Sequence, residues 1–99
     1  MTEQRGHHIL KLAIDEINEE KFAAHGLTSR QVAQILENEH IVVPNRRGRR
    51  GLLLLIGRDH GGACIAAPLE PTPIVTTWRP ITAWPCKAHE LDRLQQATD

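Results

Sequence analysis

The sequence predicts a small α+β domain, in which two short N-terminal helices and a C-terminal helix pack on an antiparallel sheet of about four to five strands. Three local signals support this class: a glycine helix stop at Gly26, a capping box that begins at Thr28, and a turn at 58–62 between two apolar runs. The 99 residues are 40% hydrophobic, which suffices for one core. We therefore expect a single domain over residues 1–99, with its core at about 9–96.

The first part of the chain begins with a short strand at 9–14, followed by a helix at 15–25, where helix formers are frequent. Gly26 ends this helix because glycine adopts a left-handed backbone at no steric cost. Thr28 and Gln31 then occupy the capping-box positions of a second helix. Its spacing of apolar residues is that of a short helix lying on a sheet, with a buried face formed by Val32, Ile35 and Leu36.

The second part of the chain is predominantly extended. A β-branched strand at 41–43 precedes the apolar run 52–56, whose unbroken character indicates burial on both faces, and 63–67 is its hairpin partner. The segment 74–84 is extended, with a bulge or an edge position required by a proline, and a helix follows at 86–96. The connection after the hairpin is stiffened by Pro68, Pro71 and Pro73. Pro80 demands the edge position or bulge, and Pro85 suits the first turn of the last helix.

The charge and the cysteine content of the chain limit the classes of function that are possible. Twelve basic and twelve acidic residues give no net charge, which excludes attraction to nucleic acid or an acidic membrane by a field of the whole molecule. Cys64 and Cys86 form neither a disulfide framework nor a CxxC motif, so we expect reduced thiols and a cytoplasmic protein. The N-terminus is too polar for a signal peptide, and the longest apolar run, 52–57, is too short to cross a membrane.

Three stretches carry a family resemblance. Residues 15–28 read DEINEEKFAAHGLT, residues 55–59 read LIGRD, and residues 79–85 read RPITAWP. In this order they resemble the BrnT-type toxins of bacterial toxin–antitoxin pairs, which have a RelE-like α+β fold, and their uncharacterised relatives. The resemblance covers roughly residues 9–96. It implies a metal-independent ribonuclease that inhibits translation and is neutralised by a cognate antitoxin encoded beside it.

RNA cleavage without a metal needs a group that deprotonates the 2′-hydroxyl, cations that stabilise the phosphorane, and an acid for the leaving oxygen. The resemblance nominates four catalytic residues, Lys21, His25, Arg79 and Glu90. The resemblance also nominates Arg58 as a further phosphate cation. The loop 45–51 adds four guanidinium groups that can grip phosphates, those of Arg46, Arg47, Arg49 and Arg50. No metal and no cofactor are expected.

Structural interpretations of the same residues stay open. His25 can serve the helix stop by bonding the last carbonyl groups, and Arg79 and Glu90 can form an ordinary ion pair between a strand and a helix. The arginine loop can simply be solvated, or it can dock an acidic segment of a partner. Cys86 and His89 lie one helical turn apart and can share a metal with Cys64 or His60.

Two further hypotheses concern partners. Residues 27–36 are similar to the first helix of a helix-turn-helix protein, although a strand follows instead of a recognition helix. The chain can also be a non-catalytic relative that uses an exposed strand edge or the arginine loop to bind a protein. Its neutral charge and its lack of tyrosine favour this second function, and Trp84 stands where many of the toxins have arginine. The expected partners are thus an antitoxin, RNA or a second copy forming a homodimer, and no membrane.

Overall fold

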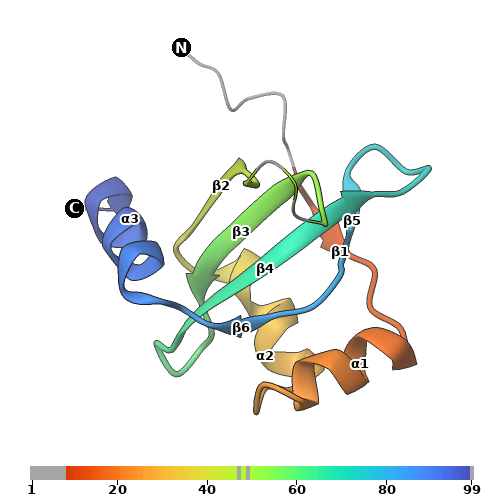
Figure 1. The fold of residues 1–99 in the computed structure, drawn as a ribbon, viewed down its shortest axis with the longest axis horizontal. Helices are drawn as coiled ribbons and strands as arrows, with labels where there is room; N and C mark the ends of the chain where they lie inside the picture. Colours follow the sequence, from red (N-terminus) through yellow and green to blue (C-terminus); the bar gives the residue numbers. More distant parts are fainter. Residues whose placement is uncertain (1–8, 47, 49, 99) are drawn as a thin grey trace.

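The computed structural model describes residues 9–46, 48 and 50–98, and it has an α+β fold in which three helices surround one sheet (Figure 1). The elements in chain order are β1 (Lys11–Leu12), α1 (Glu16–Ala23), α2 (Ser29–Gln34), the 3-10 helix η2 (Ile35–Glu37), β2 (His40–Pro44), β3 (Leu53–Arg58), β4 (Cys64–Pro71), β5 (Thr77–Pro80), β6 (Trp84–Pro85) and α3 (Ala88–Thr98). None of these helices is long and apolar enough to cross a membrane.

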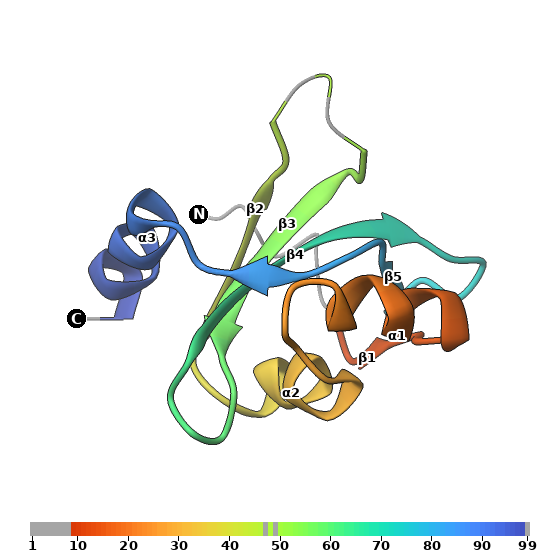
Figure 2. The ribbon, with the colours of Figure 1, turned by 60° about the horizontal axis from the view of Figure 1, so that its bottom comes forward.

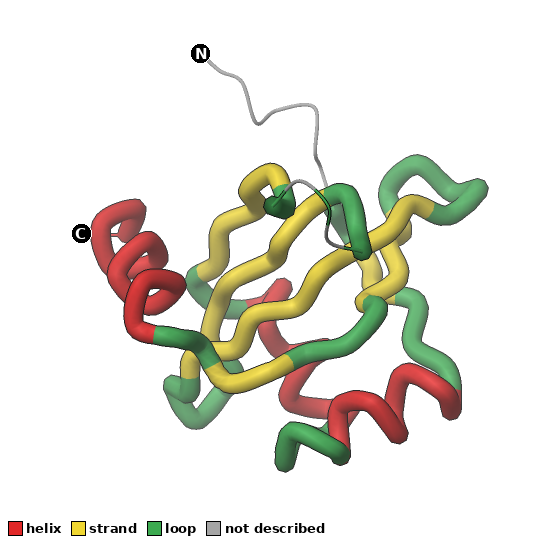
Figure 3. Tube along the Cα trace, in the orientation of Figure 1, coloured by secondary structure: helices red, strands yellow, loops and turns green. Residues whose placement is uncertain are grey.

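The sheet contains six strands in the described part of the chain, in the order β1-β5-β4-β3-β2, with β6 pairing β4 beside this path (Figure 3). All neighbours are antiparallel except β1, which runs parallel to β5. The predicted α+β class is therefore confirmed. The prediction of a purely antiparallel sheet is wrong, because the first strand is only two residues long and adds to β5 in the parallel direction.

The apolar run of β3 contributes to both faces of the sheet. Leu53 and Leu55 belong to a core cluster with Phe22 of α1 and Val32 of α2. Side chains of a strand alternate between faces, and Ile56 accordingly packs in a second cluster with side chains of β4 and α3, Ala66 and Leu94. Figure 2 shows α3 well separated from α1 and α2. The two helical layers thus cover opposite faces, as the unbroken run 52–56 predicts.

Helix α1 has well-defined ends. Asp15 accepts a hydrogen bond from the Asn18 amide at 2.9 Å, and the Asn18 side chain accepts one from the Asp15 amide at 3.1 Å. At the other end, Gly26 has φ +76°, and the Leu27 amide donates to the Phe22 carbonyl at 3.0 Å. This is a Schellman ending with both apolar residues buried, so the predicted Gly26 stop is confirmed.

Helix α2 begins at the predicted capping box. The Gln31 amide donates to the Thr28 hydroxyl at 3.1 Å, and the Thr28 amide donates to the Gln31 side chain at 2.9 Å. The helix then tightens into η2 and lies close against β3 at Gly57. A Cβ at this glycine would lie 2.6 Å from Cγ2 of Ile35 and 2.6 Å from Cβ of His40. Gly57 therefore permits the close contact between this helical layer and the sheet.

Two of the prolines after the hairpin occupy other positions than predicted, whereas Pro73 lies in the connection between β4 and β5 as expected. Pro68 and Pro71 lie within β4 rather than in a stiff connection. On one side of β4, Ile65 and Ala66 pair with β6, and residues 69–71 pair with β5. Pro68 lies between these two pairings, where no backbone N–H is needed for a hydrogen bond to either strand. The predicted extended segment 74–84 is correspondingly broken between β5 and β6.

The last helix starts later than predicted, at Ala88 rather than 86, because Pro85 belongs to β6 and not to a helical first turn. The prediction of reduced thiols is also wrong in this structure. Cys64 and Cys86 form a disulfide that joins β4 to the segment before α3, with their Cα atoms 5.3 Å apart. Their 22-residue separation hid this contact, because the hairpin register that brings them together is not visible from cysteine spacing.

Candidate functional site

A cationic hollow lies between the end of β2 and the first turns of α3. We call it the α3 groove. It has a volume of about 220 Å³ and an apolar floor formed by Leu54 and Ile56 of β3. Its rim carries Arg46, Lys87, His89 and Arg93, all of which are exposed. Three fixed positive charges and one histidine therefore gather here although the chain as a whole is neutral.

Helix α3 places two of these groups directly. His89 and Arg93 are four residues apart, a spacing that puts both side chains on one face of a helix. Lys87 immediately precedes the helix, and its Nζ lies 5.6 Å from the centre of the Trp84 ring. The sequence interpretation overlooked these three residues as a set. The i, i+4 spacing of His89 and Arg93 is the signal that could have found them.

Glu90 is buried and supports the groove from within. Its side chain is 3% exposed and accepts a hydrogen bond from the Lys87 amide at 2.8 Å. The Trp84 indole Nε1 donates to its two oxygens at 3.0 and 3.3 Å. Because both oxygens already accept protein hydrogen bonds, the geometry suits Glu90 to positioning β6, Lys87 and the start of α3.

Asn45 fixes the loop that carries the arginines. Its Nδ2 donates to the Arg50 carbonyl at 2.8 Å and to the Gly51 carbonyl at 3.2 Å, while its Oδ1 accepts from the Arg46 amide at 2.9 Å. Asn45 thereby holds Arg46 at the α3 groove and Arg50 on the other side of the loop. Arg47 and Arg49 lie outside the described residues.

The nominated catalytic residues are not gathered in one site. Lys21 lines a second hollow with Arg50 and Trp84, adjacent to the α3 groove through their common residue Asn45. Arg79 instead donates to Oδ2 of Asp15 at 3.1 Å, the residue that caps α1. The ion pair that Arg79 forms within the described residues is thus with Asp15 and not with Glu90.

His25 is exposed just beyond the end of α1. Its backbone amide donates to the Phe22 carbonyl at 2.9 Å, as part of the turn that ends this helix. Its ring does not line the α3 groove or the hollow that contains Lys21. Of the four nominated residues, only Glu90 and Lys21 therefore border the cationic region.

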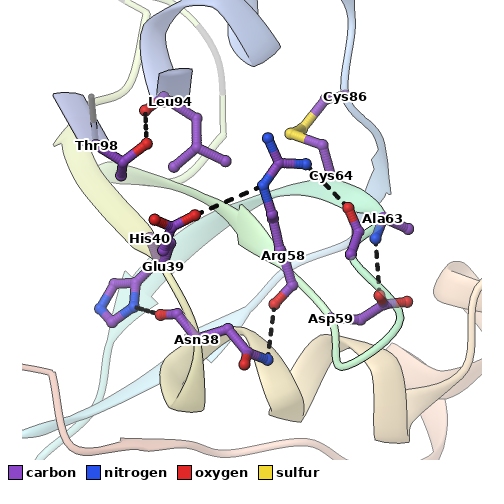
Figure 4. A network of polar contacts seen from close by, with 11 residues as sticks. Asn38, Glu39, His40, Arg58, Asp59, Ala63, Cys64, Cys86, Leu94 and Thr98 are labelled. Carbon is purple, nitrogen blue, oxygen red and sulfur yellow. Dashed lines mark hydrogen bonds and ion pairs between the residues drawn. A yellow bond between two sulfur atoms is a disulfide. The ribbon is translucent and has the colours of Figure 1, made fainter. Parts of the chain in front are cut away.

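Arg58 is held in the β3–β4 hairpin (Figure 4). It donates to the Gly62 carbonyl at 2.9 Å, and its Nε lies 3.8 Å from a Glu39 carboxylate oxygen. Arg58 is the register partner of Cys64, so it lies beside the disulfide. Its guanidinium group serves the hairpin here and does not line the α3 groove.

Asp59 anchors the same hairpin. Its carboxylate is buried and accepts hydrogen bonds from Nε2 of Gln31 at 3.0 Å and from the Ala63 amide at 2.9 Å. The Gln31 hydrogen bond is the main cause that lowers the pKa of Asp59, and it acts with backbone amides of the turn against the effect of burial. Asp59 therefore joins the turn to α2 as an ionised group.

The metal-site alternative is not formed in this structure. Cys86 is bonded to Cys64, which removes both thiolates as ligands. No group of three His, Cys, Asp or Glu side chains in the described parts of the chain lies in a metal-binding arrangement. Comparison with known proteins finds no matching family model and no significant match among curated proteins. The case for a function thus rests on the site geometry and the resemblance noted above.

Proposed function

We propose that the chain is a BrnT-like toxin with a RelE-like fold, a ribonuclease that cuts RNA at the α3 groove without a metal and is neutralised by a cognate antitoxin. The observation that carries this proposal is the concentration of Arg46, Lys87, Arg93 and His89 around one groove of a neutral chain. Cations supply phosphate affinity, and an exposed imidazole supplies a group that can accept or donate a proton.

The chemistry assigns one role to each kind of group. His89 takes the proton of a 2′-hydroxyl, and the resulting oxygen attacks the adjacent phosphorus. Lys87 and Arg93 stabilise the added negative charge on the phosphorane. The bond to the 5′ oxygen breaks, and that oxygen takes a proton from a water in the open groove. The hydroxide that is left takes the proton held by His89, and a 2′,3′-cyclic phosphate remains. Glu90 acts in this scheme as a positioning residue, since it holds Lys87 and Trp84.

Growth and cleavage assays test this proposal. Induced expression is expected to arrest growth, and purified protein is expected to degrade single-stranded RNA at low salt in the presence of EDTA. His89→Ala is expected to reduce the cleavage rate about 100-fold or more, the usual contribution of a general base. His25→Ala is the matched control and is expected to retain activity. Normal growth together with intact RNA would refute the proposal.

The proposal places this activity in the cytoplasm, where thiols are kept reduced. The α3 groove must then function in protein in which the disulfide between Cys64 and Cys86 is reduced. Cleavage measured with and without dithiothreitol tests this directly. Activity restricted to the oxidised protein would argue for a more oxidising compartment.

A second function, binding of a protein partner, is favoured by the free edge of β2. Within the described sheet this strand pairs only with β3, and its outer side borders a groove of about 660 Å³ that contains Ile41, Val43 and Arg93. The Glu39 carbonyl accepts a hydrogen bond from the Arg58 amide of the neighbouring chain segment. In an antiparallel ladder, residues that form such hydrogen bonds to the neighbouring strand alternate with residues that do not. By this alternation Val42 points its N–H and C=O away from β3, where an added strand can bond them.

Strand addition makes a specific prediction. Val42→Pro removes the outward N–H, a change that edge strands tolerate, and replaces a side chain that packs against the core with another apolar one. It is expected to abolish binding of a partner strand. Co-purification with the product of an adjacent reading frame, and sedimentation of the chain alone, test an antitoxin and a homodimer respectively. Complexes that persist in this variant would exclude the β2 edge as the binding surface.

A further inference from the structure

The hollow that contains Lys21, which we call the Trp84 pocket, lies next to the α3 groove. Its volume is about 400 Å³, within the range of sites that bind small organic groups. Pro68, Ile81 and Trp84 form an apolar surface, and Lys21 and Arg50 bring two positive charges to the same hollow. An apolar surface that contains an aromatic ring and is flanked by cations suits a flat group attached to phosphate.

The ring of Trp84 is held in place by its neighbours. Its Nε1 donates to the buried Glu90, and Lys87 lies 5.6 Å from the ring centre. Two residues later, the Cys86 amide donates to the Cys64 carbonyl of β4 at 3.0 Å, a contact that does not depend on the disulfide. Since the indole N–H is already bonded, the ring offers a ligand its π system rather than a donor. A pre-positioned ring loses little conformational entropy when a base stacks on it.

The two hollows share a lining residue. Asn45 lines both of them, and it fixes the loop that holds Arg46 at one and Arg50 at the other. Cations therefore lie at both hollows, those of Arg46 and Arg93 at the α3 groove and those of Lys21 and Arg50 at the Trp84 pocket. Thr82 adds a hydroxyl group to the wall of the Trp84 pocket.

We infer that the Trp84 pocket binds one unpaired base of a single-stranded RNA, by stacking on Trp84, while the adjoining phosphates lie on Lys21, Arg50 and the cations of the α3 groove. This inference rests on the proposed function and adds the substrate class to it. A duplex does not fit this mode, because its bases are stacked inside the helix, whereas single strands expose a π face at every nucleotide.

Tryptophan fluorescence of the complete protein tests this binding mode. Titration with a ten-nucleotide oligouridylate is expected to quench the emission, with inorganic polyphosphate and an RNA duplex as controls for charge. Trp84→Phe is expected to abolish the quench, because the tryptophan that remains, Trp78, is buried in the core. Trp84→Leu is expected to weaken RNA binding about 10-fold while polyphosphate binding stays unchanged. The wild-type titration gives the answer even where Trp84→Leu fails to fold.

The outcomes separate the two proposals. RNA that binds tightly without quenching, or polyphosphate that quenches as strongly as RNA, would overturn the stacking inference and leave the ribonuclease proposal intact. Equal affinity for duplex and single strand would also overturn it. A protein that binds no RNA at low salt would overturn both.

Discussion

The indole nitrogen of Trp84 and the buried carboxylate of Glu90 form a hydrogen-bonded pair, with distances of 3.0 and 3.3 Å to its two oxygens. The Lys87 amide joins the same carboxylate at 2.8 Å. This pair connects β6 to the first turn of α3, so one acidic side chain sets the positions of the Trp84 ring and of Lys87. The α3 groove and the Trp84 pocket therefore share a structural support.

Removal of Glu90 is expected to destabilise the fold. Glu90→Ala leaves the Trp84 Nε1 and the Lys87 amide without their acceptor, at a cost of about 1–3 kcal/mol in the free energy of unfolding. Urea unfolding measures this change, and Glu16→Ala, at an exposed position in the first turn of α1, is the control. An unchanged urea midpoint in Glu90→Ala would show that the pair contributes nothing to stability.

Loss of the disulfide is expected to cost about 3 kcal/mol, because a cross-link between residues 22 positions apart removes that much chain entropy from the unfolded state. The double variant Cys64→Ser, Cys86→Ser should match the wild type in dithiothreitol. It should itself be insensitive to the reductant. Equal stability of oxidised and reduced wild-type protein would contradict this expectation.

Asp59 is expected to make the free energy of unfolding depend on pH in the acid range. The Gln31 hydrogen bond and backbone amides hold the pKa of Asp59 below its ordinary value of 3.8 in the folded state. As pH falls, the unfolded state therefore takes up the proton before the folded state does. The contribution of Asp59 to the free energy of unfolding is complete above pH 3.8 and is lost as pH falls through the lower pKa of the folded state. Urea midpoints measured from pH 7 to pH 2.5 are expected to fall less steeply at the acid end for Asp59→Asn than for the wild type. Parallel curves would contradict this role.

Local signals predicted the fold well, since Gly26, the Thr28 cap and the 58–62 turn each depend on neighbours in sequence. The misplaced elements depend on distant partners. Pro68 is tolerated inside β4 because two different strands pair on either side of it, and the Cys64–Cys86 bond needs the β4–β6 register. Neither pairing follows from local composition.

The candidate site was predicted only in part for the same reason. Arg46 and Arg50 stood out as a basic run, and both line hollows in the structure. The packing of α3 beside β2 and β3 is what brings Lys87, His89 and Arg93 to the α3 groove. No short motif marks that contact, because it joins segments 30 or more residues apart in the sequence.

Arg79 is expected to act through α1 rather than on RNA. Its ion pair with Asp15 is partly exposed, so Arg79→Ala should cost less than about 1 kcal/mol in unfolding free energy. Asp15→Ala should cost more, since it also removes the acceptor of the Asn18 amide. RNA affinity is expected to stay unchanged in Arg79→Ala. A large loss of cleavage with normal stability would instead return Arg79 to the catalytic group.

Arg93 is expected to contribute one phosphate contact to RNA binding. The logarithm of the binding constant for a single strand falls against the logarithm of salt concentration with a slope of about 0.7 for each phosphate neutralised. Arg93→Ala should therefore reduce the magnitude of that slope by about 0.7, measured by fluorescence anisotropy at several salt concentrations. Arg30→Ala, an exposed arginine on α2 that does not line the α3 groove, is the matched control and should keep the wild-type slope. Equal slopes for both variants would place the RNA elsewhere on the surface. If Arg93 neutralises a phosphate, RNA binding to the variant without it must release fewer counterions.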